Sequence, residues 1–262
     1  MKKPIGVFDS GVGGLTVARE LFRQLPSEDI IYFGDTARVP YGIRSKETVI
    51  RFSIEDTLFL LKHDIKLICV ACNTVSSVAL PVIKNHFKVP MVGVINPGAR
   101  EAVYATRNKR IGVIGTRGTI KSRAYENEIM QLDSGVSVYA AACPLFVPFV
   151  EEGWLKGKVV EEVARKYLLP LKDAKVDTVI LGCTHYPLLK AVIRKIMGER
   201  VTLVDSAKQV AIEVKKILAG EELLSGSGKG KHRFYVSDNP EWFSGLAGKF
   251  LGYPISGVQK VG

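Results

Sequence analysis

The 262-residue chain has only four cysteines and no long hydrophobic run. Because no stretch approaches the roughly 18 apolar residues of a membrane span, we expect no contact with a membrane. The beginning, MKKPIGVFDSGVGG, also lacks an apolar stretch long enough for a signal peptide. Four cysteines are not a disulfide framework, and thiols stay reduced in the cytoplasm. We therefore expect a cytoplasmic protein in which each cysteine needs its own explanation.

Acidic residues are scarce relative to basic ones, with 26 Asp and Glu against 37 Lys and Arg and a net charge of +11. The basic residues are spread along the chain, and their densest cluster is GKGKHR at 228–233. No base-reading or stacking motif accompanies this charge, so we expect no nucleic-acid partner. A positive surface can instead attract small anionic substrates.

Short apolar runs rich in β-branched residues alternate with segments of helical period. The predicted strands lie at 4–8, 30–35, 67–72, 91–96, 110–116, 136–141, 178–183 and 201–205. The predicted helices lie at 15–25, 46–62, 98–107, 122–132, 156–171 and 207–218. This alternation is typical of an α/β protein with mostly parallel sheets flanked by helices.

Two stretches of the first half of the chain recur in the second half. IGVFDSGVGG at 5–14 resembles IGVIGTRGTI at 111–120, and the stretch 67–96 resembles 178–206. Both matches keep their order at similar offsets, which indicates a duplication. We therefore predict two similar lobes related by a pseudo-twofold axis, with the active site in the cleft between them.

The segment after residue 206 has no counterpart in the repeat, and we expect it to return to the first lobe. The first lobe would then comprise residues 1–96 plus 207–262, and the second residues 97–206. The chain would cross between the lobes near Asn96-Pro97-Gly98 and Asp205-Ser206, which are predicted hinges.

Each repeat places a cysteine where a strand ends and a helix begins. Cys72 lies in ICVACNT and Cys183 in ILGCTH. Ligands of parallel sheets bind at the carboxyl edge of the strands, and a helix N-terminus favours a thiolate and an anionic ligand. Two thiols that face one cleft suit the inversion of a carbon bearing a hydrogen, because one thiolate removes the proton and one thiol returns it on the other face.

Further polar residues belong to the same edge of the predicted sheets. Asp9 and Ser10 end the first strand, and Thr116 occupies the repeat position of Ser10. The loop VPYG at 39–42 follows the second strand, and Glu151 and Glu152 follow an apolar stretch. A carboxylate near each thiol could tune the thiols or bind a substrate ammonium group.

Five ordered blocks give the chain a specific resemblance. FDSGVGGLTV, GDTARVPYG, ACNTVSSVAL, ACPLFVPFVEEG and LGCTHYPLL resemble the signature blocks of the bacterial glutamate racemases, over residues 5 to about 220. The resemblance implies a cofactor-independent enzyme that holds no metal, acts on L- and D-glutamate, supplies D-glutamate for peptidoglycan and commonly forms a homodimer. Some members have an N-terminal extension and a cell-wall precursor as activator. The first block here starts at Ile5, so we do not expect that regulation.

The resemblance also implies roles for individual residues. Cys72 would deprotonate D-glutamate and Cys183 would deprotonate L-glutamate. Asp9, Glu151 and His185 match the assisting acid and base groups, whereas Glu152 matches none. The positions that match substrate-contacting residues of the family are Ser10, Tyr41, Gly42, Asn73, Thr74, Thr116 and Thr184.

Other readings of the same residues remain open at this point. A racemase of aspartate would use the same two-thiol chemistry. Cys69, Cys72, Cys183 and His185 could form a zinc site, although Cys-x-His is an unusual ligand spacing. GVGG at 11–14 invites a nucleotide-binding reading, but Thr16 stands where a dinucleotide fingerprint has its third glycine. CVAC at 69–72 has the redox spacing, but Cys69 lies within the predicted strand and is read as a core residue.

Overall fold

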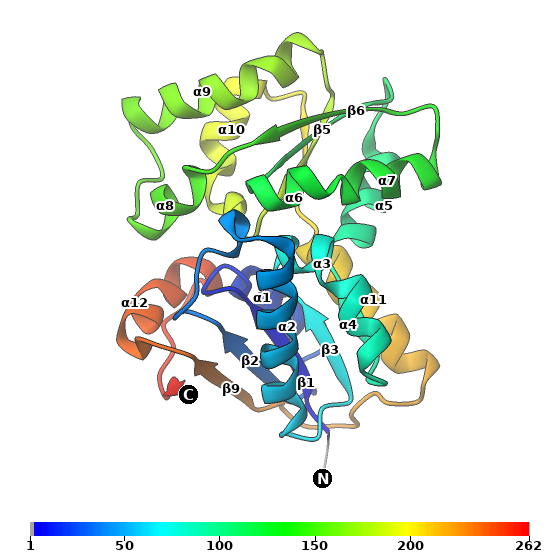
Figure 1. Ribbon diagram of the computed structural model, residues 1–262, viewed down its shortest axis with the longest axis vertical. Coiled ribbons are helices and arrows are strands. Elements are labelled where there is room, and N and C mark those ends of the chain that lie inside the picture. Colours follow the sequence, from blue (N-terminus) through cyan, green and yellow to red (C-terminus); the bar gives the residue numbers. More distant parts are fainter. Residues whose placement is uncertain (1–2, 262) are drawn as a thin grey trace.

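Two parallel β-sheets, one in each lobe, form the framework of the protein (Figure 1). The computed structural model describes residues 3–261. The first sheet has the order β10-β9-β2-β1-β3-β4. Its strands are β1 (Ile5–Asp9), β2 (Ile30–Gly34), β3 (Leu67–Val70), β4 (Met91–Gly93), β9 (His232–Val236) and β10 (Gln259–Lys260). The second sheet has the order β6-β5-β7-β8, with β5 (Arg110–Gly115), β6 (Ser137–Ala142), β7 (Thr178–Gly182) and β8 (Thr202–Val204).

The strand orders reflect the duplication that the sequence indicates. The first four strands are ordered β2-β1-β3-β4 and the next four are ordered β6-β5-β7-β8, so each lobe has the same arrangement. The repeated sequence stretches correspond to β1 with β5 and to β3 with β7. The predicted two-lobed α/β architecture is thereby confirmed. The late strand β9 pairs with β2 and extends the first sheet.

Helices cover both faces of each sheet, which is why the central strands β1, β3, β5 and β7 are largely buried. On one face of the first sheet, Ile5 and Val7 of β1 pack into a core with helix α1, and on the other face Phe8 packs into a separate core with helix α2. The helices before the crossing to the second lobe are α1 (Leu15–Gln24), α2 (Lys46–Leu61), α3 (Asn73–Val78) and α4 (Leu80–His86), with the short 3-10 helix η1 (Tyr41–Ile43).

The helices of the rest of the chain follow the same alternation. They are α5 (Ile95–Ala105), α6 (Arg117–Ser122), α7 (Ala124–Leu132), α8 (Phe146–Glu151), α9 (Lys158–Asp173), α10 (Lys190–Met197), α11 (Ala207–Gly220) and α12 (Pro240–Leu251), with the 3-10 helix η2 (Tyr186–Leu189). No helix within residues 3–261 has the length and apolarity needed to cross a bilayer.

Three differences from the predicted elements have local causes. The predicted strand 91–96 ends at Gly93, and Asn96-Pro97-Gly98 lies in the first turn of α5 instead of forming a loop hinge, because proline is accepted there. The predicted helix 122–132 is divided at Arg123, whose φ of 56° is left-handed. Helices α8 and α12 are too short or too rich in glycine and proline to have been predicted.

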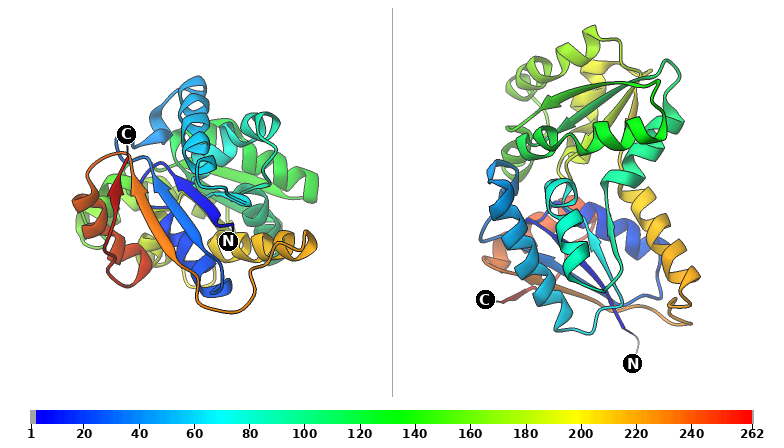
Figure 2. Two further views of the ribbon diagram at one scale, coloured as in Figure 1. Left: turned by 90° about the horizontal axis from the view of Figure 1, so that it is seen from below. Right: turned by 45° about the vertical axis from the view of Figure 1, so that its right-hand side comes forward.

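Helices α5 and α11 connect the two lobes, and they lie side by side at the edge of the molecule (Figure 2). Arg100 of α5 forms an ion pair with Glu213 of α11 at 2.6 Å, and Gln209 of α11 donates to Glu101 of α5 at 2.8 Å. The chain thus enters the second lobe directly through α5 and returns through the short turn Asp205-Ser206 into α11, and side-chain contacts bind the two helices to each other.

Candidate active site

The carboxyl edges of the two sheets face each other, and each presents a cysteine. Cys72 follows β3 and is the N-cap residue of α3, while Cys183 follows β7 and precedes η2. Both are free thiols, each only 6% exposed, and both line the same small cavity between the lobes. The two strand ends that the sequence singled out thus converge on one site.

The Cys72 thiol donates to the hydroxyl of Ser10 at 3.7 Å. Burial, together with the negative charge of Asp9, raises the pKa of Cys72 to about 12. Hydrogen bonds from the backbone N–H of Val75 and from Ser10 act in the opposite direction. The neighbourhood of Cys72 therefore holds a neutral thiol and already contains donors that can stabilise a thiolate.

The Cys183 thiol has different neighbours. Its sulfur lies 3.9 Å from Nδ1 of His185, and Nε2 of the same ring lies 3.0 Å from Oε1 of Glu151. The Phe250 ring of α12 packs edge-on against His185. Burial raises the pKa of Cys183 well above its usual range, the N–H of His185 lowers it, and negative charge on Cys72 raises it. A thiol–imidazole–carboxylate chain thus extends from the cavity to Glu151.

Asp9 lies behind the cavity, between the two lobes. Its carboxylate accepts from the backbone N–H of Gly11 at 2.9 Å and from the hydroxyl of Thr184 at 3.5 Å. Burial raises the pKa of Asp9, and the charge of His185 partly offsets that effect. A buried carboxyl with a raised pKa can exchange a proton closer to neutral pH.

Hydroxyl and amide groups line the rest of the cavity. Thr74 of the first lobe and Thr116 of the second lie 2.9 Å apart through their hydroxyl oxygens, and Thr119 is within hydrogen-bond distance of both. Asn73 accepts from the hydroxyl of Tyr125 at 2.7 Å through Oδ1. Polar groups of the two lobes therefore meet across the cleft.

The loop that contains Tyr41 and Gly42 closes one side of the cavity. The Tyr41 hydroxyl is bound to the buried carboxylates of Asp35 and Asp56, so that it does not point at the thiols. A Cβ on Gly42 would come within 2.5 Å of Cβ of Thr116, which explains why glycine is needed where this loop meets the second lobe. Tyr41 thus fixes the loop, and Gly42 allows its close approach.

Most of the residues predicted from the sequence line this one cavity, and Asp9 and Glu151 contact residues that do. The cavity-lining members of the predicted set are Ser10, Tyr41, Gly42, Cys72, Asn73, Thr74, Thr116, Cys183, Thr184 and His185. Val39, Pro40 and Val147 also line it and were not predicted. Val39 and Pro40 could have been included because they share the VPYG block, whereas nothing in the sequence marks Val147.

The glycine-rich loop after β1 has a packing role. A Cβ on Gly13 would lie 2.5 Å from Nδ1 of His185 and would also collide with the hydroxyl of Thr184. Thr16 donates to the carbonyl oxygens of Gly13 and Thr184, at 3.0 Å and 3.4 Å. The second lobe thus occupies the space that a phosphate would need, so a nucleotide site at this loop is not favoured.

The zinc and redox readings find no geometric support either. Within residues 3–261, no three His, Cys, Asp or Glu side chains are grouped so as to hold a metal ion. Cys69 lies inside β3, is fully buried and packs in the core, as its reading as a core residue requires.

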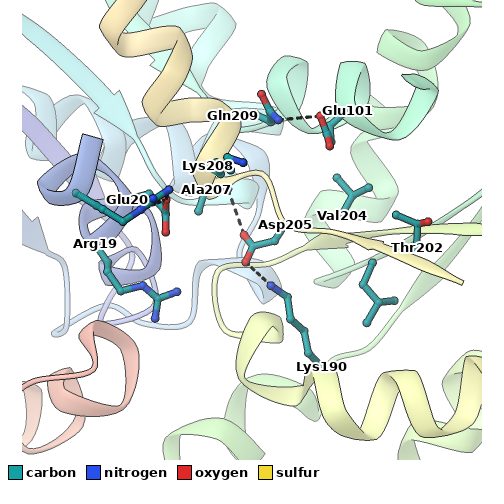
Figure 3. Close-up of a pocket in the computed structure, with 12 residues that line it drawn as sticks. Arg19, Glu20, Glu101, Lys190, Thr202, Val204, Asp205, Ala207, Lys208 and Gln209 are labelled. Carbon is teal, nitrogen blue, oxygen red and sulfur yellow. Dashed lines mark hydrogen bonds and ion pairs between the residues drawn. The ribbon is translucent and has the colours of Figure 1, made fainter. Parts of the chain in front are cut away.

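The cavity between the thiols is small, with about 20 Å³ of space, which is enough for about one water molecule. A larger hollow of about 320 Å³ lies between α1, α11 and β8 (Figure 3). Its charged side chains are largely bound to one another: Lys190 pairs with Asp205 at 2.8 Å, and Glu101 accepts from Gln209. This hollow lies beside the point where the chain crosses back to the first lobe.

Comparisons with known proteins agree with the geometry. The sequence profile of the family described as Asp/Glu/Hydantoin racemase matches residues 5–213. The chain is 54% identical to a glutamate racemase of Geobacter metallireducens over 260 residues, which is 99% of this chain and 96% of the relative. Among solved structures, it resembles glutamate racemase isoform RacE1 of Bacillus anthracis with a TM-score of 0.95 and 44% identity, over 99% of this chain and 97% of the other.

A third similar protein was solved with a ligand. Glutamate racemase of Francisella tularensis in complex with D-glutamate has a TM-score of 0.93 and 38% identity, and the match covers 100% of this chain and 98% of that one.

Proposed function

The chain belongs to the Asp/Glu/Hydantoin racemase family, and on that premise we propose that it interconverts L- and D-glutamate. It is a glutamate racemase, an isomerase that supplies D-glutamate for peptidoglycan. One observation carries the mechanism: two buried thiols from opposite lobes line one cavity. An aspartate racemase would have the same pair of thiols, but the full-length relatives of high identity are glutamate racemases.

The reaction needs two proton transfers, one on each face of the α-carbon. The Cys72 thiolate takes the α-proton of D-glutamate, so that an S–H bond forms and the electron pair of the broken C–H bond passes into the adjacent carboxylate. The Cys183 thiol then gives its proton to the opposite face, which yields L-glutamate and a Cys183 thiolate. The reverse direction exchanges the roles, and no cofactor takes part.

Both thiols are neutral in this site, because burial raises the pKa of each. One of them must lose a proton before catalysis. The positive ammonium group of the substrate lowers the pKa of a thiol next to it. Asp9 on the Cys72 side and the His185–Glu151 pair on the Cys183 side are the groups that exchange this proton in the proposal.

The remaining predicted residues bind the substrate in this proposal. Hydroxyl or amide groups of Ser10, Asn73, Thr74, Thr116 and Thr184 line the cavity, whereas Tyr41 and Gly42 contact the substrate as part of the cavity wall. Since the cavity holds only about 20 Å³, glutamate can reach the thiols only if the lobes separate. We propose that residues 1–96 plus 207–262 and residues 97–206 are the two units that move.

We also propose a cellular location and an oligomeric state for the enzyme. Four free cysteines suit a reducing compartment, which supports the cytoplasm as its location. A homodimer follows from the resemblance to the family, and the molar mass of the purified protein by light scattering tests it.

The test of the reaction uses EDTA-treated protein with L-glutamate in D2O, without pyridoxal phosphate. Loss of circular dichroism together with deuterium at the α-carbon is the expected result. Cys72→Ser and Cys183→Ser should each lower the rate of racemisation by at least about 100-fold, since a positioned acid or base contributes about 10²–10⁴-fold.

The two cysteine variants should differ in the proton exchange that remains. Cys183→Ser should exchange the α-proton of D-glutamate faster than it forms L-glutamate, because Cys72 still faces that proton. No exchange by the wild-type protein, with glutamate or aspartate, would refute the proposal.

A further inference from the structure

Tyr125 joins the second lobe to a polar group beside the first thiol. It lies in α7, is only 2% exposed, and its hydroxyl donates to Oδ1 of Asn73 at 2.7 Å. Asn73 directly follows Cys72 and lines the cavity between the thiols. Among residues 3–261, the sequence-distant hydrogen-bond partner of this amide is therefore a buried tyrosine from the opposite lobe.

The other side of Tyr125 faces the crossing between the lobes. A Cβ built on Gly98 of α5 would lie 3.3 Å from the Tyr125 ring and 3.2 Å from Cβ of Ser206, so the three residues converge. A hydrogen bond from Ser206 is among the causes that act on the pKa of Tyr125. Tyr125 is thus held between the crossing and the cavity.

The crossing itself is fixed by the residue before Ser206. Asp205 accepts from Nζ of Lys190 at 2.8 Å and from the backbone N–H of Ala207 at 3.2 Å (Figure 3). These contacts hold the turn that leads into α11. A continuous set of contacts therefore extends from this turn through Ser206 and Tyr125 to Asn73.

The contact with Tyr125 sets the orientation of the Asn73 amide: a hydrogen bond from Ser206 reaches the Tyr125 oxygen, so the Tyr125 hydroxyl gives its own proton to Oδ1 of Asn73. A primary amide has an acceptor oxygen and two N–H donors. With Oδ1 bound to the hydroxyl, Nδ2 is left as the donor, and no described residue is hydrogen-bonded to it. An N–H donor suits a carboxylate, whereas a carbonyl oxygen in the same place would repel it. The amide orientation therefore determines whether Asn73 can bind an amino-acid carboxylate.

We propose that Tyr125 is a positioning residue that fixes the Asn73 amide with Nδ2 toward the cleft, where it binds a carboxylate of the substrate. This inference deepens the proposed function and rests on it. Because the amide is oriented by a residue of the opposite lobe, the correct orientation is available only when the lobes are together. Tyr125 thereby links closure of the cleft to substrate binding.

The test is Tyr125→Phe, which removes the hydroxyl and keeps the ring. Tyr186→Phe is the matched control, because Tyr186 is also fully buried and its hydroxyl donates to a backbone oxygen, that of Cys143, at 2.8 Å. Loss of one hydrogen bond should raise the KM of Tyr125→Phe for both enantiomers about 3- to 10-fold, with kcat within about twofold. The control should keep the KM of the wild-type protein.

A double-mutant cycle with Asn73→Ala separates positioning from packing. If Tyr125 acts through Asn73, adding Tyr125→Phe to Asn73→Ala should leave the KM unchanged. An unchanged KM in Tyr125→Phe would overturn the inference, and so would an equal rise in both tyrosine variants or additive effects in the cycle. An inactive wild-type protein would instead overturn the proposed function, and the two failures are therefore distinguishable.

Discussion

Gly13 offers a sharp test of how closely the lobes pack, because it has no side chain and a substitution there removes no catalytic group. A Cβ at this position would lie 2.5 Å from Nδ1 of His185, whereas ordinary van der Waals contact begins at about 3.4 Å. Gly13→Ala must therefore displace the imidazole or the loop after β1 by about 1 Å. The imidazole cannot move freely, because Glu151 and Phe250 hold it on its other sides.

This displacement has two measurable consequences. Overpacking of a well-packed interior costs about 1–3 kcal/mol, so the free energy of unfolding in urea should fall by that amount. A shift of about 1 Å in a catalytic group can cost about 100-fold in rate, so kcat/KM for racemisation should fall by about that factor. Circular dichroism of L-glutamate solutions measures the rate directly.

The matched control is Gly245→Ala. Gly245 is exposed inside α12, and a Cβ there would meet no atom within 4 Å. Replacing a helical glycine by alanine should raise the free energy of unfolding by roughly 0.5–1 kcal/mol and leave the activity unchanged. Activity of Gly13→Ala within threefold of wild type, with unaltered stability, would contradict the tight packing of this loop against His185.

Two further predictions concern buried groups outside the cavity. Burial raises the pKa of Cys69 from 9.0 to about 12, so its contribution to stability is complete below pH 9 and lost toward pH 12. Between pH 8 and pH 10 the wild-type protein should lose about 1.4 kcal/mol more than Cys69→Ala in urea unfolding, and equal losses would refute this. The Tyr41 hydroxyl has one proton for the two carboxylates of Asp35 and Asp56, and burial and the charge of Asp35 raise the pKa of Asp56 well above its usual range, so we expect Asp56 to take up a proton more readily. Arg38 pairs with Asp35 at 2.6 Å and also contacts Asp56 and Glu55, so at pH 7 Asp35→Asn should cost roughly 1–2 kcal/mol more than Asp56→Asn; a reversed order would show that the proton lies on Asp35.

Much of the fold could be predicted because the chain repeats itself and its central strands are buried on both faces. The ends of β3 and β7 were identifiable from apolar runs that stop at Cys72 and Cys183. The order of strands within each sheet, and the pairing of β9 with β2, required the structure. Helix α12 was missed because Gly245 and Gly248 in its interior lower helix propensity, and tertiary packing outweighs that loss.

The candidate site was only partly accessible from the sequence. Residues beside the thiols could be identified, because the repeat and the family blocks mark them. Tyr125 could not, because its importance depends on a contact with Asn73, which is 52 positions away in the chain. The same holds for Asp35 and Asp56, which act on the cleft only through the Tyr41 hydroxyl. Partners that approach each other in three dimensions leave no spacing signal in one sequence.

Duplication accounts for the matching positions of the two thiols but not for their surroundings. Cys72 has Ser10 and Asp9 as neighbours, whereas Cys183 has His185 and Glu151. The two enantiomers have equal free energy in solution, so kcat/KM must be equal in both directions whatever the thiols touch. Unequal neighbours can therefore make kcat differ between the two directions only if KM differs between them by the same factor. The two lobes could therefore diverge in how each thiol loses its proton, while the equilibrium between L- and D-glutamate stayed the same.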